Sequence, residues 1–439
     1  MPRSAVRLLS VVLTVLLVTS ARGDNWPRFR GENGAGVSTQ PGIPSTWDDD
    51  DYAWKVDLPG VGHSSPVIWD KSLFITSARE DGTQQSLQCL DVDSGTERWR
   101  IELAFGRSEK HLKNSWASST PVMDGECVYL VSADEESQIA AAWDFSGNQI
   151  WSRNLGPYSR EHGQGASPIV AGELLIVPND QPGPSSILAL RVTDGEVVWQ
   201  VERPSSHTTY STPMLLPGGD GRFQLICLSQ PSGMTSYDLL TGALKWQTKP
   251  MPMRTVSSPV EFGGVIIAAC GSAGTGKYLM AVDAGETVAA DSRFLFKRTA
   301  QLPYVPTSIA RDGLLFPWGD TGVLKCLELP SGDEVWMKRV TGGTFSGSPI
   351  WVDGRLFAVS EEGEVFVVRA SREYEFLGNT PLGGRFPCHS GGCEWSPLPA
   401  NLRKTVRASG EWRERVISAA SREIHGLTIS GMTGGRQLS

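Results

Sequence analysis

The sequence predicts an all-β protein, an eight-bladed β-propeller built from one repeated unit. A Ser/Thr-rich step into an apolar run occurs seven times, and equivalent positions are 41 to 55 residues apart. That period suits four short strands per unit, as in a propeller blade, rather than a helical solenoid. In five units a Trp stands four residues after a turn Gly. The apolar runs begin at Pro66, Pro121, Pro168, Pro213, Pro259, Ser308 and Pro349, and the Gly/Trp pairs are Gly95/Trp99, Gly147/Trp151, Gly195/Trp199, Gly242/Trp246 and Gly332/Trp336.

Each repeat also contains short β-branched and aromatic runs after Asp, Gly or Asn, which predict strands; 72–76, 127–131 and 355–359 are examples. In the turn before Trp99, Asp and Ser side chains bond local amides and Gly95 supplies a positive φ. We expect each Trp to lie on an outer strand, where its ring covers the seam between blades and its N–H reaches a backbone carbonyl. The alternative for these rings is stacking on a cofactor. The predicted blade-docking residues are Trp54, Trp99, Trp151, Trp199, Trp246 and Trp336.

The blade count follows from the outer strands. Residues 294–296 and 374–376 replace the Trp-type strand in the fifth and seventh units, and 54–58 supplies an outer strand before any inner one. That first strand must complete a blade whose inner strands come from the C-terminus, which removes the open edge of the ring. The propeller is therefore assigned to residues 54–386.

The stretch 387–439 has no blade pattern, and we interpret it as an out-of-frame, disordered tail. Codons compatible with Pro387 to Arg407, read one nucleotide out of phase, can encode HATPAVANGRLYLRTYEKLYA directly after Phe386. That string holds an inner Ala-Thr-Pro run, an Asn-Gly turn and two strands. A single inserted nucleotide would explain the missing blade.

These features resemble the pyrroloquinoline-quinone-like (PQQ-like) β-propeller repeat family. It includes eight-bladed quinoprotein dehydrogenases and the propeller lipoprotein of the outer-membrane barrel-assembly machinery. The opening Asn25 to Val37 and the run Gly62 to Pro66 are similar to a branch of secreted propellers from planctomycete-type bacteria. The resemblance covers residues 25 to 386 and implies the fold more strongly than the function.

The N-terminus predicts export. Arg3 and Arg7 precede an apolar run from Leu8 to Val18, and the small residues Ala21 and Gly23 follow at the positions that signal peptidase reads, as in a secretory signal peptide over 1–23. Residues 24–53 form an N-terminal extension. The apolar run is short for a transmembrane helix, and no Cys follows it to carry the lipid of the barrel-assembly relative. We expect a periplasmic or extracellular protein with no integral membrane segment.

The charge of the body limits its partners. Without residues 1–23 and 387–439, the chain holds 30 basic and 44 acidic residues, a net charge of −14. An acidic body without Lys/Arg runs is a poor match for nucleic acid or anionic membranes. The expected partner is a protein or an extracellular polymer, and the expected state is a monomer.

Several motifs have plain structural readings. The spacing of Cys388, His389 and Cys393 resembles a zinc site but lacks a fourth ligand. The acidic run 48–51 lacks the Gly and distal Glu of a calcium loop, and 271–277 precedes a predicted strand rather than the helix of a phosphate loop. The five body cysteines are single, and we interpret them as buried apolar residues. No metal site is predicted.

One face of the ring holds the candidate binding residues. All four body histidines fall in segments that lead from an outer strand into the next inner strand, so they should share a face. Such histidines could bind a metal or an anion, or they could be bonded only to nearby backbone carbonyls. The candidate set is His63, Asn114, Trp116, His162, Gln164 and His207, with His111 on the same face.

The sequence favours a secreted, non-catalytic propeller that acts as a scaffold for a protein or polymer, without catalytic residues or cofactor. The alternative is a periplasmic quinoprotein-like oxidoreductase with PQQ and Ca²⁺. The resemblance implies that such enzymes hold the quinone beneath a disulfide of adjacent cysteines, on a Trp floor, with Ca²⁺ bound by Glu, Asn and Asp beside a catalytic Asp. No adjacent cysteines occur in this chain.

Overall fold

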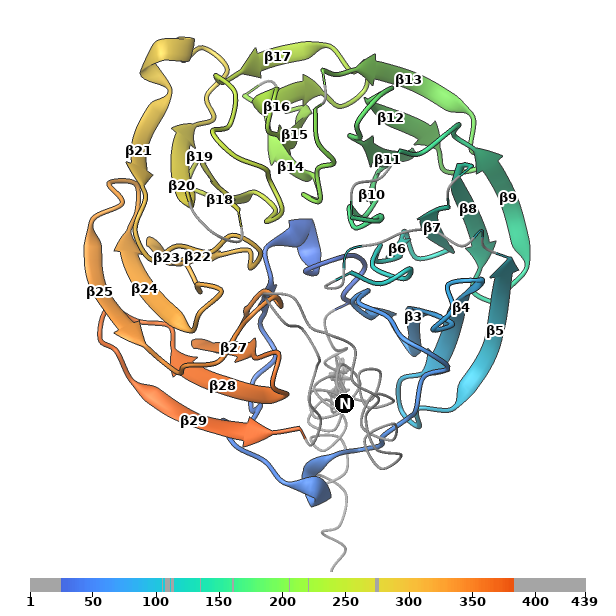
Figure 1. Cartoon of the computed structure of the whole chain (residues 1–439), viewed down its shortest axis with the longest axis horizontal. Helices are drawn as coiled ribbons and strands as arrows, with labels where there is room; N and C mark the ends of the chain where they lie inside the picture. The colour runs from blue at the N-terminus through green and yellow to red at the C-terminus, as the bar shows by residue number, and fades with distance from the viewer. Residues whose placement is uncertain are drawn as a thin grey trace, which may run out of the picture.

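A computed structural model describes residues 25–382, apart from 105, 107–110, 112–113, 135, 160–161, 205, 220 and 273–275. The strands form seven sheets, each with four consecutive antiparallel strands, and Figure 1 shows the sheets arranged around a central axis. The prediction of an all-β propeller is confirmed to this extent. The predicted signal peptide, the tail from Pro387 and its Cys/His motif lie outside the described residues.

The strands follow one another from the axis outward in every sheet. The first three sheets are β2 (Val67–Trp69), β3 (Ser72–Ala78), β4 (Gln84–Asp91), β5 (Glu97–Ala104); β6 (Val122–Met123), β7 (Cys127–Ala133), β8 (Gln138–Asp144), β9 (Gln149–Asn154); and β10 (Ile169–Ala171), β11 (Leu174–Asn179), β12 (Ser186–Arg191), β13 (Val197–Glu202). The next two are β14 (Met214–Pro217), β15 (Phe223–Ser229), β16 (Gly233–Asp238), β17 (Leu244–Gln247); and β18 (Val260–Phe262), β19 (Val265–Cys270), β20 (Tyr278–Asp283), β21 (Phe294–Arg298).

The last two sheets are β22 (Ile309–Arg311), β23 (Leu314–Phe316), β24 (Val323–Glu328), β25 (Glu334–Arg339); and β26 (Ile350–Val352), β27 (Arg355–Val359), β28 (Glu364–Arg369), β29 (Phe376–Pro381). The N-terminal β1 (Val37–Ser38) adds a parallel fifth strand beside β26. The described residues contain no α-helix, only the short 3₁₀ helices η1 (Glu32–Gly34), η2 (Asp49–Asp51) and η3 (Ala290–Ser292). None of their helices is long and apolar enough to span a bilayer.

Burial explains the strand composition. The middle strands β3 and β4 are almost wholly buried because one face of their sheet packs on the second sheet and the other face is covered by Trp54 and Leu58. At the rim, β5 alternates between exposed and half-buried residues. The apolar clusters accordingly lie between sheets: one joins Met214, Ile226 and Leu228 of one blade to Ile266 and Met280 of the next. The core is therefore a series of interblade layers around the ring.

A hydroxyl belt explains the repeated Ser/Thr before each inner strand. In each blade one Ser or Thr lies just before the inner strand, and its backbone N–H donates to the side-chain hydroxyl of the equivalent Ser or Thr in the next blade. Six such bonds, 2.8 to 3.3 Å long, join Ser65, Thr120, Ser167, Thr212, Ser258, Thr307 and Ser348 in that order. The proline that follows in six of these steps holds the residue extended. Within the described residues the belt ends at the Ser65 hydroxyl and the Ser348 N–H.

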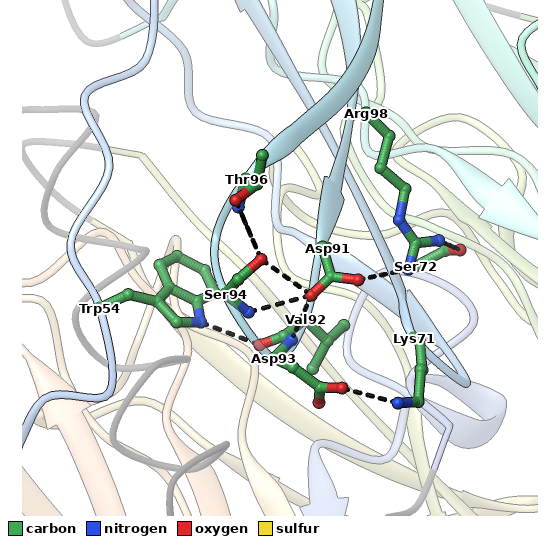
Figure 2. A network of polar contacts seen from close by, with 9 residues as sticks. All are labelled: Trp54, Lys71, Ser72, Asp91, Val92, Asp93, Ser94, Thr96 and Arg98. Atoms are coloured by element: carbon green, nitrogen blue, oxygen red, sulfur yellow. Dashed lines mark hydrogen bonds and ion pairs between the residues drawn. The ribbon is translucent and has the colours of Figure 1, made fainter.

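The tryptophans join each blade to the next. Figure 2 shows the indole N–H of Trp54 donating to the carbonyl of Val92 at 2.9 Å, beside a turn in which the Asp91 carboxylate accepts from the N–H and hydroxyl of Ser94. Four other tryptophans donate in the same way to a turn carbonyl one blade further on: Trp99 to Phe145, Trp151 to Val192, Trp199 to Leu239 and Trp336 to Ser371, at 2.7 to 3.1 Å.

A glycine in the turn leaves room for each ring. A Cβ on Gly95, Gly195 or Gly242 would come within 2.5 to 2.8 Å of the ring of Trp54, Trp151 or Trp199, respectively. Phe296 takes the same place over Gly332, where a Cβ would lie 2.6 Å from its ring. The Trp after one turn therefore lies over the Gly of the following turn.

Two blades depart from this pattern. In the fifth sheet the turn glycine, Gly285, does not lie against the ring of Trp246. The guanidinium of Arg293 lies 4.3 Å from the centre of that ring, and the Trp246 N–H donates to the Gln224 side chain instead of a backbone carbonyl. In the seventh sheet the expectation that residues 374–376 replace the Trp is wrong. Gly378 pairs with Val367 at the Trp position, because the turn of residues 370–375 is one residue longer than the turn of residues 92–96 in the first sheet, and Phe376 is exposed.

Residues 41–60 span the interval between β29 and the first sheet, at the lower edge of Figure 1. Trp47 and Tyr52 pack on the face of β27 and β28, while Trp54 and Leu58 pack on β3 and β4. This segment therefore contacts both sheets that flank the interval.

Candidate functional site

The centre of the ring is occupied by residues 25–38, which we call the axial segment. It contacts inner strands on opposite sides of the ring. Trp26 pairs with Ile68 of β2, and the Pro27 carbonyl accepts from the N–H of Met123 in β6. Asn33 exchanges two hydrogen bonds of 2.8 Å with the backbone of Leu215 in β14. The blue trace at the centre of Figure 1 follows this path.

Two buried arginines fix the axial segment. Arg28 donates to the carbonyl of Pro213 at 2.6 Å, and Arg30 donates to those of Ser308 and Pro349 at 3.1 and 2.9 Å. Arg30 also bonds two carbonyls of its own loop. Burial lowers the pKa of both guanidinium groups to about 9, which leaves them charged at neutral pH. The arginines thus connect the axial segment to three separate inner-strand entries.

Sequence reasoning assigned residues 24–53 only as an extension, so the axial segment is new information from the structure. Its local signal is the density of Gly and Arg between Arg28 and Gly36. Glycines and the positive φ of Arg30 and Asn33 allow tight turns, while the arginines seek carbonyls far away in sequence.

The predicted candidate set lies in connectors that enter inner strands, and part of it gathers between the second and third sheets. The side-chain amide of Asn114 donates to the carbonyls of His162 and Gln164 at 2.7 and 3.1 Å. The rings of His111 and His162 lie 4.9 Å apart, and the Gln164 side chain donates to the Val131 carbonyl. Asn114, His162 and Gln164 are therefore brought together, with His111 beside them.

The other candidates contact different connectors. The backbone N–H of His63 donates to the carbonyl of Ala117. The ring of the adjacent Trp116 packs on Gly82. His207 lies beside Arg254, 3.4 Å from Nδ1 to Nη2, one blade further on from His162. Across the described part of the chain, no three His, Cys, Asp or Glu side chains come close enough to hold a metal ion. The candidates are thus distributed around one face instead of forming one cluster.

The cysteines, the 271–277 loop and the acidic run 48–51 are parts of the fold. Cys89, Cys227, Cys270 and Cys326 are buried and Cys127 is half-buried, which confirms their reading as interior residues. Burial raises the pKa of the Cys227 thiol to about 12. The strand predicted after the 271–277 loop is confirmed as β20. The acidic run 48–51 is exposed and forms η2, capped by Asp48.

Comparisons with known proteins agree with this architecture. Residues 47–215 match the sequence family described as outer membrane protein assembly factor BamB. BamB from Moraxella catarrhalis is 13% identical over 76% of this chain and 89% of its own, with a TM-score of 0.54. Quinohemoprotein alcohol dehydrogenase ADHIIG from Pseudomonas putida HK5 is 13% identical over 91% of this chain and 88% of its own, with a TM-score of 0.51.

None of the curated proteins matches the chain. At 13% identity the two solved structures show the fold alone. The repeated Ser/Thr-Pro steps, the Trp-on-Gly contacts and the two comparisons agree: residues 47–215 match the BamB family of PQQ-like repeats, and the described chain has the propeller fold of BamB and of the quinohemoprotein dehydrogenase.

Proposed function

We propose that this protein is a non-catalytic scaffold that binds a partner protein through the faces of its ring. The observation that carries the proposal is the axial segment: the ring centre is filled by the chain's own residues, fixed to three inner-strand entries by Arg28 and Arg30. The connectors and turns on the two faces then offer the accessible surface. Many loops on a rigid frame suit partner binding, although fold alone does not determine function.

The quinone alternative makes specific demands on the residues. A PQQ site with Ca²⁺ requires carboxylate and amide oxygens around an open aromatic floor. At the ring centre the structure instead places guanidinium groups bonded to backbone carbonyls. On the hairpin between β23 and β24, the acidic side chain of Asp320 accepts from Lys277 and from the N–H groups of Tyr304 and Val305. These donor sets do not fit the cofactor, so we propose that the protein binds no quinone.

Export is part of the same proposal. The basic and apolar pattern of residues 1–23 supports secretion to the periplasm or the cell exterior, where the propeller would meet protein or polymer partners. Expression in a Gram-negative host, fractionation and mass spectrometry of the mature N-terminus test this. Cleavage after Gly23 is expected, and an uncleaved cytoplasmic product contradicts it.

We further propose that the functional ring has eight blades and that a reading-frame shift truncates the last one. Trp54 makes the same contact with the first sheet that Trp99 makes with the second, so residues 54–58 take the place of an outer strand. The hydroxyl belt supports the same blade, because its two ends, Ser65 and Ser348, flank the interval. The out-of-phase string supplies Ala-Thr-Pro, and its Thr is the residue type needed to join them.

Resequencing the gene across the codons for Phe386 and Pro387 tests the frame. A chain carrying the out-of-phase string should melt at a higher temperature than the present one, because it adds a belt bond on each side and covers two sheet faces. An unaltered frame on resequencing, together with an unchanged melting temperature, overturns the eight-blade proposal.

The scaffold function is tested with the purified chain in two assays. Affinity capture with chemical crosslinking from an envelope fraction should recover a specific protein or polymer. Incubation with PQQ and Ca²⁺, followed by dye-linked assays on alcohols and sugars, should give no turnover and no bound quinone absorbance. Stoichiometric quinone binding with turnover refutes the proposal.

A further inference from the structure

A groove of about 580 Å³ lies between the third and fourth sheets. It opens where inner strands end, on the face opposite the connectors that carry the histidines. Leu174, Leu215 and Leu239 line it and are buried or half-buried. Phe223 and Leu240 also line it, with 47% and 60% of their surface exposed. Exposed apolar side chains gathered around a hollow mark an interaction site more often than single ones do.

The groove exists because the fourth blade departs from the repeat. Residues 218–222 connect β14 to β15, whereas the equivalent connections in the other six sheets have two or three residues. The inner strand β14 is also longer, with four residues instead of two or three. Pro217 pairs with Phe223 at the end of this longer hairpin. The departure therefore places an exposed aromatic side chain at the wall of the groove.

The charged side chains beside the groove indicate the charge that a partner should carry. Arg191 forms an ion pair with Asp194 at 2.6 Å. Glu173 lines the groove, is exposed, and forms no ion pair with the described residues. The whole chain carries a net charge of −8. A basic side chain of a ligand would thus contact the carboxylate of Glu173, and the adjacent side chains of the ligand would contact the apolar lining of the groove.

We propose that this groove binds an extended segment of a partner protein that carries large apolar side chains flanked by lysine or arginine. The volume is within the range of roughly 300–1,000 Å³ seen in ligand pockets, which is room for a few such side chains. Apolar anchors would give affinity and the contact with Glu173 would give charge selectivity. The inference rests on the proposed scaffold function and locates its binding surface.

Fluorescence anisotropy with the full chain tests the groove, using the fluorescein-labelled peptide GSKLFLKSG. Matched peptides replace the apolar core (GSKSSSKSG) or reverse the charge (GSELFLESG), and each should bind at least tenfold more weakly. A Phe223→Ser/Leu240→Ser double variant should weaken binding of the first peptide at least tenfold, and Glu173→Gln about threefold. A Phe294→Ser/Leu295→Ser double variant removes two exposed apolar side chains on β21 and should bind like the original.

Thermal melts establish that these surface variants are folded. Equal affinity for all three peptides, or no effect of the Phe223 and Leu240 changes, overturns the proposal. Sedimentation showing a dimer that the same double variant dissociates also overturns it, because a second copy then occupies the groove. Capture of a partner that ignores the groove changes rejects this surface but leaves the scaffold function standing, whereas quinone turnover rejects the scaffold.

Discussion

Substituting Gly195 with alanine tests whether the Trp-on-Gly contact holds adjacent blades together. Gly195 has φ 71°, and an added Cβ would lie 2.5 Å from Cε3 of Trp151. The matched control is Gly313→Ala: Gly313 has φ 75°, but its Cβ would meet nothing within 4 Å. Both changes impose the same left-handed backbone strain, so their difference isolates the contact with the indole.

The structure gives the magnitude. Left-handed strain costs about 1 kcal/mol at either position. At Gly195 the indole or the turn must also shift by about 1 Å to restore ordinary carbon contacts. That shift weakens the 2.7 Å bond from Trp151 to the Val192 carbonyl, worth about 1 kcal/mol, and disturbs interblade packing by about 1–3 kcal/mol. We expect Gly195→Ala to lower the free energy of unfolding by about 2–4 kcal/mol more than Gly313→Ala.

Differential scanning calorimetry of the two variants and the parent measures this. Gly195→Ala should melt several degrees below Gly313→Ala. In a Trp151→Ala background, the extra loss at Gly195 should vanish, since the clashing ring is gone. Equal melting temperatures for the two glycine variants, or an undiminished loss without Trp151, would refute the reasoning.

Three further predictions concern other features. Arg30→Met should lower the free energy of unfolding by about 3 kcal/mol or more in calorimetry, because buried carbonyls of two inner-strand entries lose their donor; a loss below 1 kcal/mol contradicts the anchoring role. Thr212→Val should cost about 1–2 kcal/mol in the same measurement, since the buried N–H of Ser167 loses its acceptor, whereas Thr193→Val at the exposed rim should be neutral. Burial raises the pKa of Cys227 and Cys326 from 9.0 to about 12, so stability that these thiols contribute below pH 9 should fall as pH rises from 9 to 12. Urea unfolding across that range checks the slope, which should decrease in a Cys227→Ala variant; at pH 8 mass spectrometry should find both thiols unmodified by iodoacetamide until the protein is unfolded.

The sequence predicts the repeated part of this fold because the same physical need recurs in every blade. A residue such as Thr212 before Pro213 marks an inner strand, and a Gly before a Trp marks a turn and an outer strand. Gly378 was missed because the turn of residues 370–375 has one residue more than the turn of residues 92–96, so the aromatic residues fall short of the Trp position and a glycine takes it.

The candidate site is less accessible to sequence reasoning. The shared face of the histidines follows from topology, but each connector bonds its immediate neighbour, as Asn114 does with His162, and that pairing has no local signal. The position of the axial segment could not be predicted from the sequence for a related reason. Arg30 donates to the carbonyl of Pro349, 319 positions away, and a backbone acceptor has no sequence signature.

The hydroxyl belt has a consequence for how such molecules change over time. Because these units meet through one main-chain donor and one small alcohol, the six junctions that the belt spans in the described residues are chemically alike. Duplication of a gene segment can therefore add a blade, or deletion remove one, without changes to the adjoining blades, as long as the added blade has a serine or threonine before its inner strand.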